Sequence, residues 1–161
     1  MLVTDYTTYN EIRATLGVSD EDITDATLAL TLYSDYLRGE HEDISLTLPS
    51  TYATVKALVT PDGAQTRFLA ASRLFATFSV AKQLTAALPL FAAKQVTDGK
   101  AAVSRFDTSY KDVVKSVNEQ YEKLRSRLVA ALTALGTTTT DATAAVFFST
   151  VAPSIDVITN V

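Results

Sequence analysis

The sequence predicts an all-α fold, a small bundle of four to five helices with two long helices, a short hairpin-like loop and an extended C-terminal tail. Apolar residues recur at spacings of three and four, which is the helical period. Signals for helix starts and ends frame these stretches. With 161 residues, 47% of them apolar, the chain can bury a hydrophobic core as one unit without disulfides. We expect a helical domain over residues 1–136 and a tail over residues 137–161.

Two short helices are expected near the N-terminus. Thr8-Tyr9-Asn10-Glu11 has the form of a capping box, and Leu16-Gly17 ends the first helix with glycine as a left-handed cap. The carboxylates of Asp20, Glu21 and Asp22 favour the start of a second helix, which stops near Arg38-Gly39. One face of this second helix carries regularly spaced apolar residues: Ile23, Ala26, Leu30, Tyr33 and Leu37.

Residues 40–63 are less regular, and we expect a loop with one short helix that carries Tyr52, Val55 and Val59 before Pro61-Asp62-Gly63. A third helix, from Ala64 to about Leu88, has the pattern of a central core helix. Its predicted core side carries Phe68, Ala71, Leu74, Phe75, Phe78 and Ala81, and its opposite side carries Gln65, Thr66, Ser72, Arg73, Ser79 and Gln83.

A turn and a long helix follow. Asp98-Gly99 is a favoured turn pair, so we expect a small hairpin or an extended loop there. The fourth helix carries more than three heptads of a coiled-coil-like seam and ends at Gly136. Its seam residues are Tyr110, Val114, Val117, Tyr121, Leu124, Leu128, Ala131 and Leu135. Such a helix packs on more than one neighbour, within the subunit or across an interface.

The last segment changes character after the four threonines at 137–140. Ile155, Val157 and Thr159 alternate with Asp156, Ile158 and Asn160, and this alternation of β-branched residues favours an extended conformation. An apolar, β-prone tail is a candidate for adding a strand to a partner, and it can also fold back on its own domain. Because of Pro153, an added strand starts after that residue.

Charge is unevenly placed along the chain. Residues 1–43 hold ten acids and two bases, a charge of −8. Since the net charge of the chain is −4, the remaining residues carry +4. This pattern is poorly suited to clamping nucleic-acid phosphates. It suits head-to-tail contact between copies of the chain, although a solvated charged surface explains it as well.

Little in the chain suggests catalysis, and we expect no enzyme and no cofactor. There is no Cys and a single His, His41, which lies in an acidic stretch and is expected on the surface. No phosphate loop, nucleophile elbow or metal-spaced carboxylate motif is present. Arg67 and Arg73 are expected to pair with acids of the second helix, and Tyr110 and Tyr121 to be core or interface aromatics. The first residues lack a signal peptide, and the run from Phe68 to Ala93 is too polar to span a membrane, so we expect no membrane association.

The order of elements resembles tailed-bacteriophage head–tail connector (adaptor) proteins. The resemblance is carried by residues 8–13 and 16–20, by the core-helix run 67–81, and by Val96-Thr97-Asp98-Gly99-Lys100 with Arg105-Phe106 before the long helix. It implies a structural virion protein of the head–tail neck, made in the host cytoplasm. Such a subunit forms a ring, commonly of twelve copies, beneath the portal protein. The ring extends the DNA channel without sequence-specific binding and supports the next neck or tail component.

The resemblance also implies roles for particular residues. The portal-binding tail comprises Val146, Phe147, Phe148, Val151, Ile155, Val157, Ile158 and Val161. The subunit interface comprises Tyr110, Val114, Val117, Tyr121, Leu124 and Leu128, and the neck-facing loop comprises Val96, Asp98, Gly99 and Lys100. The alternative is a cytosolic helical binding or regulatory module whose Tyr110–Leu135 seam recruits a partner helix.

Overall fold

The all-α class predicted from the sequence is confirmed by the computed structural model, which describes residues 2–86, 97–98, 101–102 and 110–150. A short 3₁₀ turn, η1 (Val3–Asp5), precedes four short helices, α1 (Tyr9–Leu16), α2 (Asp25–Leu28), α3 (Thr31–Glu42) and α4 (Leu48–Lys56). Two long helices follow, α5 (Gly63–Thr85) and α7 (Tyr110–Thr150). Two strands, β1 (Thr97–Asp98) and β2 (Ala101–Ala102), pair antiparallel as a small hairpin, as the Asp98-Gly99 turn predicts.

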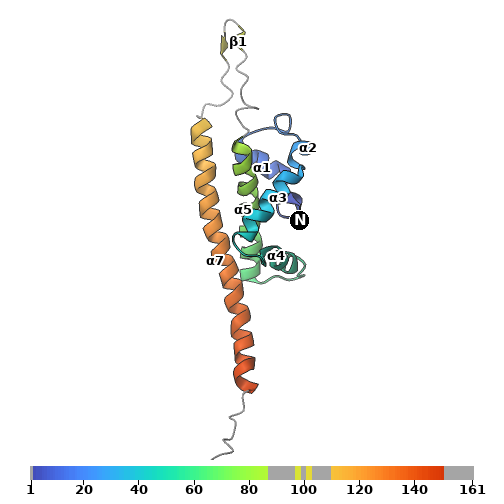
Figure 1. Ribbon diagram of the computed structural model, residues 1–161, viewed down its shortest axis with the longest axis vertical. Coiled ribbons are helices and arrows are strands. Elements are labelled where there is room, and N and C mark those ends of the chain that lie inside the picture. Colours follow the sequence, from blue (N-terminus) through green and yellow to red (C-terminus); the bar gives the residue numbers. More distant parts are fainter. Residues whose placement is uncertain (1, 87–96, 99–100, 103–109, 151–161) are drawn as a thin grey trace, which may run out of the picture.

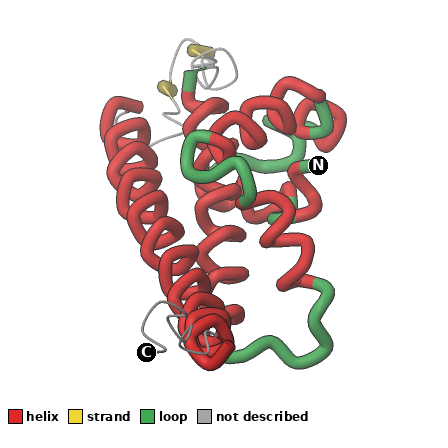
Figure 2. The backbone as a smooth tube through the Cα atoms, turned by 60° about the horizontal axis from the view of Figure 1, so that its bottom comes forward, coloured by secondary structure: helices red, strands yellow, loops and turns green. Residues whose placement is uncertain are grey.

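Helix α5 is the centre of the molecule. The short helices α1, α3 and α4 pack on it from one side, and α7 runs antiparallel to it on the other (Figure 1). Figure 2 shows the same two-sided arrangement from a tilted view. At about 1.5 Å per residue, α7 is about 60 Å long and α5 about 35 Å, so α7 continues well past α5 at its C-terminal end.

The first helix begins and ends as its sequence predicts. The Thr8 hydroxyl accepts a hydrogen bond from the Glu11 backbone N–H at 3.3 Å, and the Glu11 carboxylate accepts one from the Thr8 N–H at 3.4 Å. Gly17 has φ +66°, the left-handed conformation that makes glycine the favoured residue after a helix. Both the capping box and the glycine cap are therefore confirmed.

The predicted second helix is in fact two helices, α2 and α3. Thr24 caps α2 by accepting from the Thr27 N–H, and the chain turns at Ala29 and Leu30 before α3 begins. Leu30, predicted on the buried face, is exposed because it lies at this break. The end predicted near Gly39 is also wrong, because Gly39 continues the helix, which ends at Glu42.

The middle of the chain is more helical than predicted. Helix α4 begins at Leu48 and takes Pro49 into its first turn, where a missing N–H costs nothing. Leu48, Tyr52 and Val55 are buried, whereas Val59 lies beyond the end of the helix and is 96% exposed.

Helix α5 is the predicted core helix, and Asp62 caps it through a second capping box with Gln65. The predicted division into two faces is only partly right. Ser72 and Ser79, predicted on the polar side, are fully buried, and Leu74, predicted in the core, is 42% exposed. The reason is that α5 has neighbours on both sides, so polar positions that face a neighbour are buried with the apolar ones.

The predicted end of the long helix at Gly136 is wrong. Backbone helix continues through Gly136 and the four threonines to Thr150, so residues 137–150 are helical rather than extended. Among the described glycines only Gly17 has a positive φ, and Gly136 therefore does not form a left-handed cap. Ala142, Ala144 and Ala145 have high helix propensity, which favours continuation. The rest of the predicted tail, residues 151–161, lies outside the described residues.

Candidate interaction surfaces

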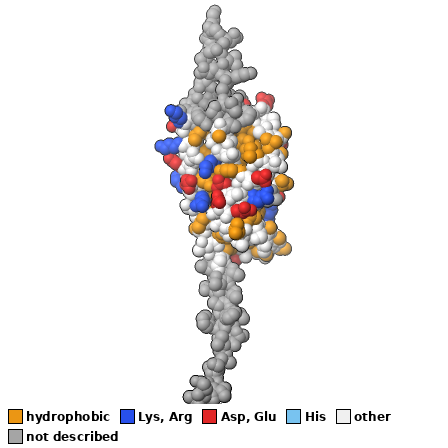
Figure 3. Space-filling view, viewed as in Figure 1, with side chains coloured by type: hydrophobic (Ala, Val, Ile, Leu, Met, Phe, Trp, Pro, Cys, Tyr) orange, Lys and Arg blue, Asp and Glu red, His pale blue; other side chains and the backbone are white. Residues whose placement is uncertain are grey.

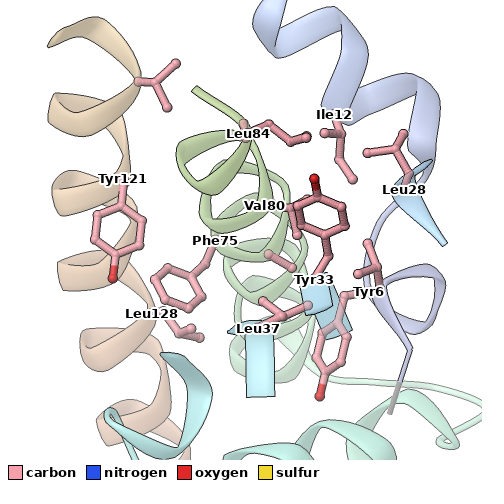
Figure 4. Packing of buried hydrophobic residues seen from close by; sticks show 14 of the residues in the cluster. Tyr6, Ile12, Leu28, Tyr33, Leu37, Phe75, Val80, Leu84, Tyr121 and Leu128 are labelled. Atoms are coloured by element: carbon pink, nitrogen blue, oxygen red, sulfur yellow. The ribbon is translucent and has the colours of Figure 1, made fainter. Parts of the chain in front are cut away.

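The heptad seam of α7 is buried against α5 of the same chain. Val117, Tyr121, Leu124 and Leu128 are each less than one-tenth exposed. The rings of Tyr121 and Phe75 lie with their centroids 5.5 Å apart, and Leu128 packs on the same side of Phe75 (Figure 4). Val117, Tyr121 and Leu128 belong to one core cluster that also contains residues of α1, α3 and α4.

This burial changes the role of the predicted subunit interface. Three of its six residues, Val117, Tyr121 and Leu128, are covered within the chain and cannot also meet a neighbouring subunit. Leu124 is also buried, 6% exposed, but it lies at the edge of a groove between α5 and α7. Val114 is half-buried, and the Tyr110 side chain lies outside the described part. The same burial covers Val117, Tyr121 and Leu128 of the seam that the alternative function would use to recruit a partner helix. The spacing of three and four correctly indicated an apolar face, but it could not tell which helix covers it.

A polar cluster joins α7 to the short helices. The Tyr121 hydroxyl donates a hydrogen bond to the Glu40 carboxylate of α3, and the Lys82 ammonium lies 3.7 Å from the centroid of the Tyr121 ring. Burial raises the pKa of Tyr121, and the hydrogen bond to Glu40 raises it further. The pKa of Tyr36 is raised by the same two causes. One carboxylate thus holds two tyrosine hydroxyls, one from α3 and one from α7.

His41, predicted on the surface, is fully buried, so that prediction is wrong. It lies on α3 between the rings of Tyr6 and Phe75, with centroid distances of 4.6 and 5.6 Å. Neither ring nitrogen has a hydrogen-bond partner in the described part of the chain. Burial lowers the pKa of His41 to about 4, against the opposing effect of the nearby Glu40 charge. The spacing Tyr33, Leu37, His41 could have revealed its place on the buried face.

Ion pairs connect the short helices to each other and to α5. Arg13 is buried, donates to the Ile23 carbonyl at 2.7 Å and pairs with Asp25. Arg73 pairs with Glu11 of α1, not with an acid of the predicted second helix. The predicted pairing of Arg73 is therefore wrong in its partner.

A groove lies between α5 and α7, with a volume of about 450 Å³. Alanines and leucines form most of its lining, and Arg67 and Arg127 contribute its charges. The residues that line it are Ala64, Arg67, Ala70, Ala71, Leu74, Leu124, Arg127, Ala130, Ala131 and Ala134. Neither arginine has an ion-pair partner among the described residues, so the predicted pairing of Arg67 is wrong. Sequence reasoning missed this groove, although the alanines recur at helical spacing on both helices.

A second exposed surface lies around the turn from α2 to α3. Leu30 and Leu32 are 53% and 57% exposed, and the preceding connection carries the exposed acids Asp20 and Glu21. Figure 1 shows α2 on the side of α5 away from α7. The face drawn in Figure 3 mixes acidic and basic side chains with apolar ones between them, unlike a continuous basic surface for nucleic acid.

A second hollow, of about 480 Å³, separates η1 from α4. The Tyr52 hydroxyl and the Lys56 ammonium both donate to the Asp5 carbonyl across it, at 3.2 and 2.5 Å. Because these polar groups already serve to hold η1 on α4, the hollow is explained by the packing of the N-terminus.

The remaining predicted site residues are only partly placed. Asp98 lies in β1, while Val96, Gly99 and Lys100 of the predicted neck-facing loop lie outside the described residues. Val146, Phe147 and Phe148 of the predicted portal-binding tail lie on the backbone of α7, and Val151, Ile155, Val157, Ile158 and Val161 lie outside the described part. Figure 1 shows the hairpin at one end of the molecule and the last turns of α7 at the other.

Within the described residues, no group of three or more acidic or histidine side chains could hold a metal ion. None of the helices described combines the length and hydropathy needed to cross a bilayer. Comparison of the chain with protein-family models, with curated proteins and with solved structures finds no match in any of the three.

Proposed function

We propose that the chain is a structural virion protein, a head–tail connector that assembles as a ring beneath a phage portal. In this role it extends the DNA channel and supports the next neck or tail component. The proposal begins from the resemblance of its element order to the adaptor family. One structural observation carries it further, the continuation of α7 past α5.

The C-terminal part of α7 and the β1–β2 hairpin lie at opposite ends of the subunit (Figure 1). Ala134 lines the groove together with Ala64 of the first turn of α5, so residues beyond 136 extend past the packed domain. The 14 helical residues 137–150 extend about 20 Å at 1.5 Å per residue. This elongated shape supports the proposed connector role, because a connector contacts one component at each of its two ends.

The surface supports the same role. A channel subunit works best with few strong phosphate contacts, because such contacts would retard the passage of DNA. The chain has a net charge of −4, and its described arginines include several already paired with carboxylates.

Electron microscopy of the purified protein mixed with portal-bearing, connector-free phage heads tests the proposal. We expect a ring of density stacked on the portal, with the portal-distal side open to the next neck protein. A discrete dimer in solution with no added density at the portal would overturn the connector function. The same assay with a chain ending at Gly136 tests the tail, because its domain keeps the α5–α7 core and loses the extension. Normal portal docking by this shortened chain would show that the tail does not bind the portal.

A further inference from the structure

The groove between α5 and α7 is an apolar surface that the described part of its own chain leaves open. Leu74 lies in its lining and is 42% exposed, an unusual state for a leucine on the central helix of a bundle. Its remaining lining consists mostly of alanine, which leaves space for side chains from another molecule. A volume of about 450 Å³ is enough to admit apolar side chains of a partner.

The two arginines of the groove are free to pair with a partner. Arg13, Arg38 and Arg73 each have a carboxylate within the chain, from Asp25, Asp35 and Glu11 respectively. Arg67 and Arg127, by contrast, have no such carboxylate among the described residues, and both are exposed. Guanidinium groups at the rim of an apolar groove favour an acidic partner with apolar side chains at its centre.

The same chain carries a surface of this description. Leu30 and Leu32 are exposed at the start of α3, and Asp20 and Glu21 are exposed in the connection before α2. Neither of these acids has a cationic partner in the described part of the chain. The segment that holds them belongs to residues 1–43, whose charge balance is −8.

We propose that the α5–α7 groove of one copy binds the segment from Asp20 to Leu32 of a second copy. Leu30 and Leu32 enter the groove, and Asp20 and Glu21 pair with Arg67 and Arg127. The two surfaces are different and lie on different sides of α5 (Figure 1), so the contact is heterologous and repeats from copy to copy. This inference rests on the proposed function, because it names the contact between neighbouring subunits of the ring.

Cysteine cross-linking tests this contact in the purified full-length protein. Because the chain contains no cysteine, an introduced thiol is unique. We expect the Leu32→Cys variant, mixed with a mass-tagged Ala130→Cys variant at high concentration and low salt, to form a disulfide-linked heterodimer under mild oxidation. A chain with both substitutions should form a covalent ladder. Added salt should lower the yield, because it screens the ion pairs at the rim.

Matched variants separate this contact from random collision. Ser50 is exposed on α4, outside both surfaces, so Ser50→Cys with Ala130→Cys sets the background. Arg127→Glu in the groove chain should lower the yield several-fold, and Glu21→Arg in the other chain should restore part of it. Leu30→Cys with Ala134→Cys is a second pair, used if circular dichroism shows that a variant of the first pair has lost helix.

The outcomes distinguish this contact from the connector function. Yields at the Ser50→Cys background, or linkage of Ala130→Cys mainly to itself, would overturn the contact. A ring on the portal without these cross-links would leave the connector function standing and show that the ring uses another surface. A covalent ladder without density at the portal would support the contact and overturn the connector function.

Discussion

The short N-terminal helices and the pair of long helices are stabilised in different ways. Polar contacts serve α1, α2 and α4: Thr8 with Glu11, Arg13 with the Ile23 carbonyl and Asp25, and Tyr52 with the Asp5 carbonyl. The long pair has a continuous apolar contact instead, from Val117 to Leu128 along α7. The polar contacts join particular pairs of helices at single points, whereas the apolar contact holds the long helices together along several turns.

Phe75 belongs to both regions. Its ring lies 5.6 Å from that of His41 on α3 and 5.5 Å from that of Tyr121 on α7, centroid to centroid. We therefore expect the loss of this side chain to destabilise the fold more than the loss of any single cap. Substitution of Phe75 tests the contact between the two regions, and substitution of a helix cap tests one region alone.

The largest expected effect is that of Phe75→Ala. It removes a fully buried ring from between α3 and α7 and leaves a cavity with partners on both sides. We expect the free energy of unfolding to fall by about 3–5 kcal/mol. Urea unfolding followed by circular dichroism measures the change.

Phe78→Ala is the matched control for this prediction. Phe78 is on the same helix but only half-buried, so its removal should cost clearly less than that of Phe75. An equal loss of free energy of unfolding in the two variants would show that the contacts of Phe75 with α3 and α7 stabilise the fold no more than other contacts of α5.

The next effect is a pH dependence that comes from the N-terminal region. Because the pKa of His41 is about 4 in the folded chain and near 6.5 when unfolded, only the unfolded chain binds its proton between these values. The free energy of unfolding therefore has its full value, as far as His41 is concerned, above pH 6.5, and it falls as the pH is lowered towards 4. The total loss is about 3 kcal/mol. Tyr6, whose pKa is raised to about 12, stays neutral throughout this range.

His41→Leu isolates this effect, because it keeps the buried position apolar and removes the titrating group. We expect its free energy of unfolding to be at least that of the parent at pH 7 and to vary less between pH 6.5 and 4. Denaturant unfolding at several pH values measures both slopes. Parallel pH profiles for the two proteins would contradict the burial of His41 as the source.

The sequence predicts the local features of both regions better than the contacts between them. The Thr8 box and the Gly17 cap depend on residues only a few positions apart, and both are present as predicted. The spacing of α7 predicts a buried face but carries no information about which helix covers it, so a contact within the subunit and a contact across an interface are both consistent with the sequence. His41 was misplaced for a related reason, because acidic neighbours in sequence outweighed its helical spacing from Leu37. The α5–α7 groove is lined by residues 64–74 of α5 and 124–134 of α7, about 60 positions apart in the sequence, and the spacing within one helix does not show that these two faces lie together.

A smaller effect is expected at Gly17, where one region alone is affected. Its φ of +66° is unfavourable for any residue with a Cβ, so Gly17→Ala should destabilise the fold by about 1–2 kcal/mol. Space is not the cause, since an added Cβ meets nothing within 4 Å. Thermal unfolding measures the loss, and an unchanged melting temperature would contradict the strain argument.

The smallest effect, with the opposite sign, is expected at Gly136. Both glycines follow a leucine and both were predicted to end a helix, yet Gly136 lies inside α7 with helical backbone and open space around its Cβ position. Gly136→Ala should therefore stabilise the helix by about 0.5–1 kcal/mol, because alanine loses less backbone entropy than glycine. Circular dichroism should show equal or greater helix content. If Gly136→Ala instead destabilised the chain as Gly17→Ala does, α7 would end at Gly136, and the extension that supports the connector proposal would be lost.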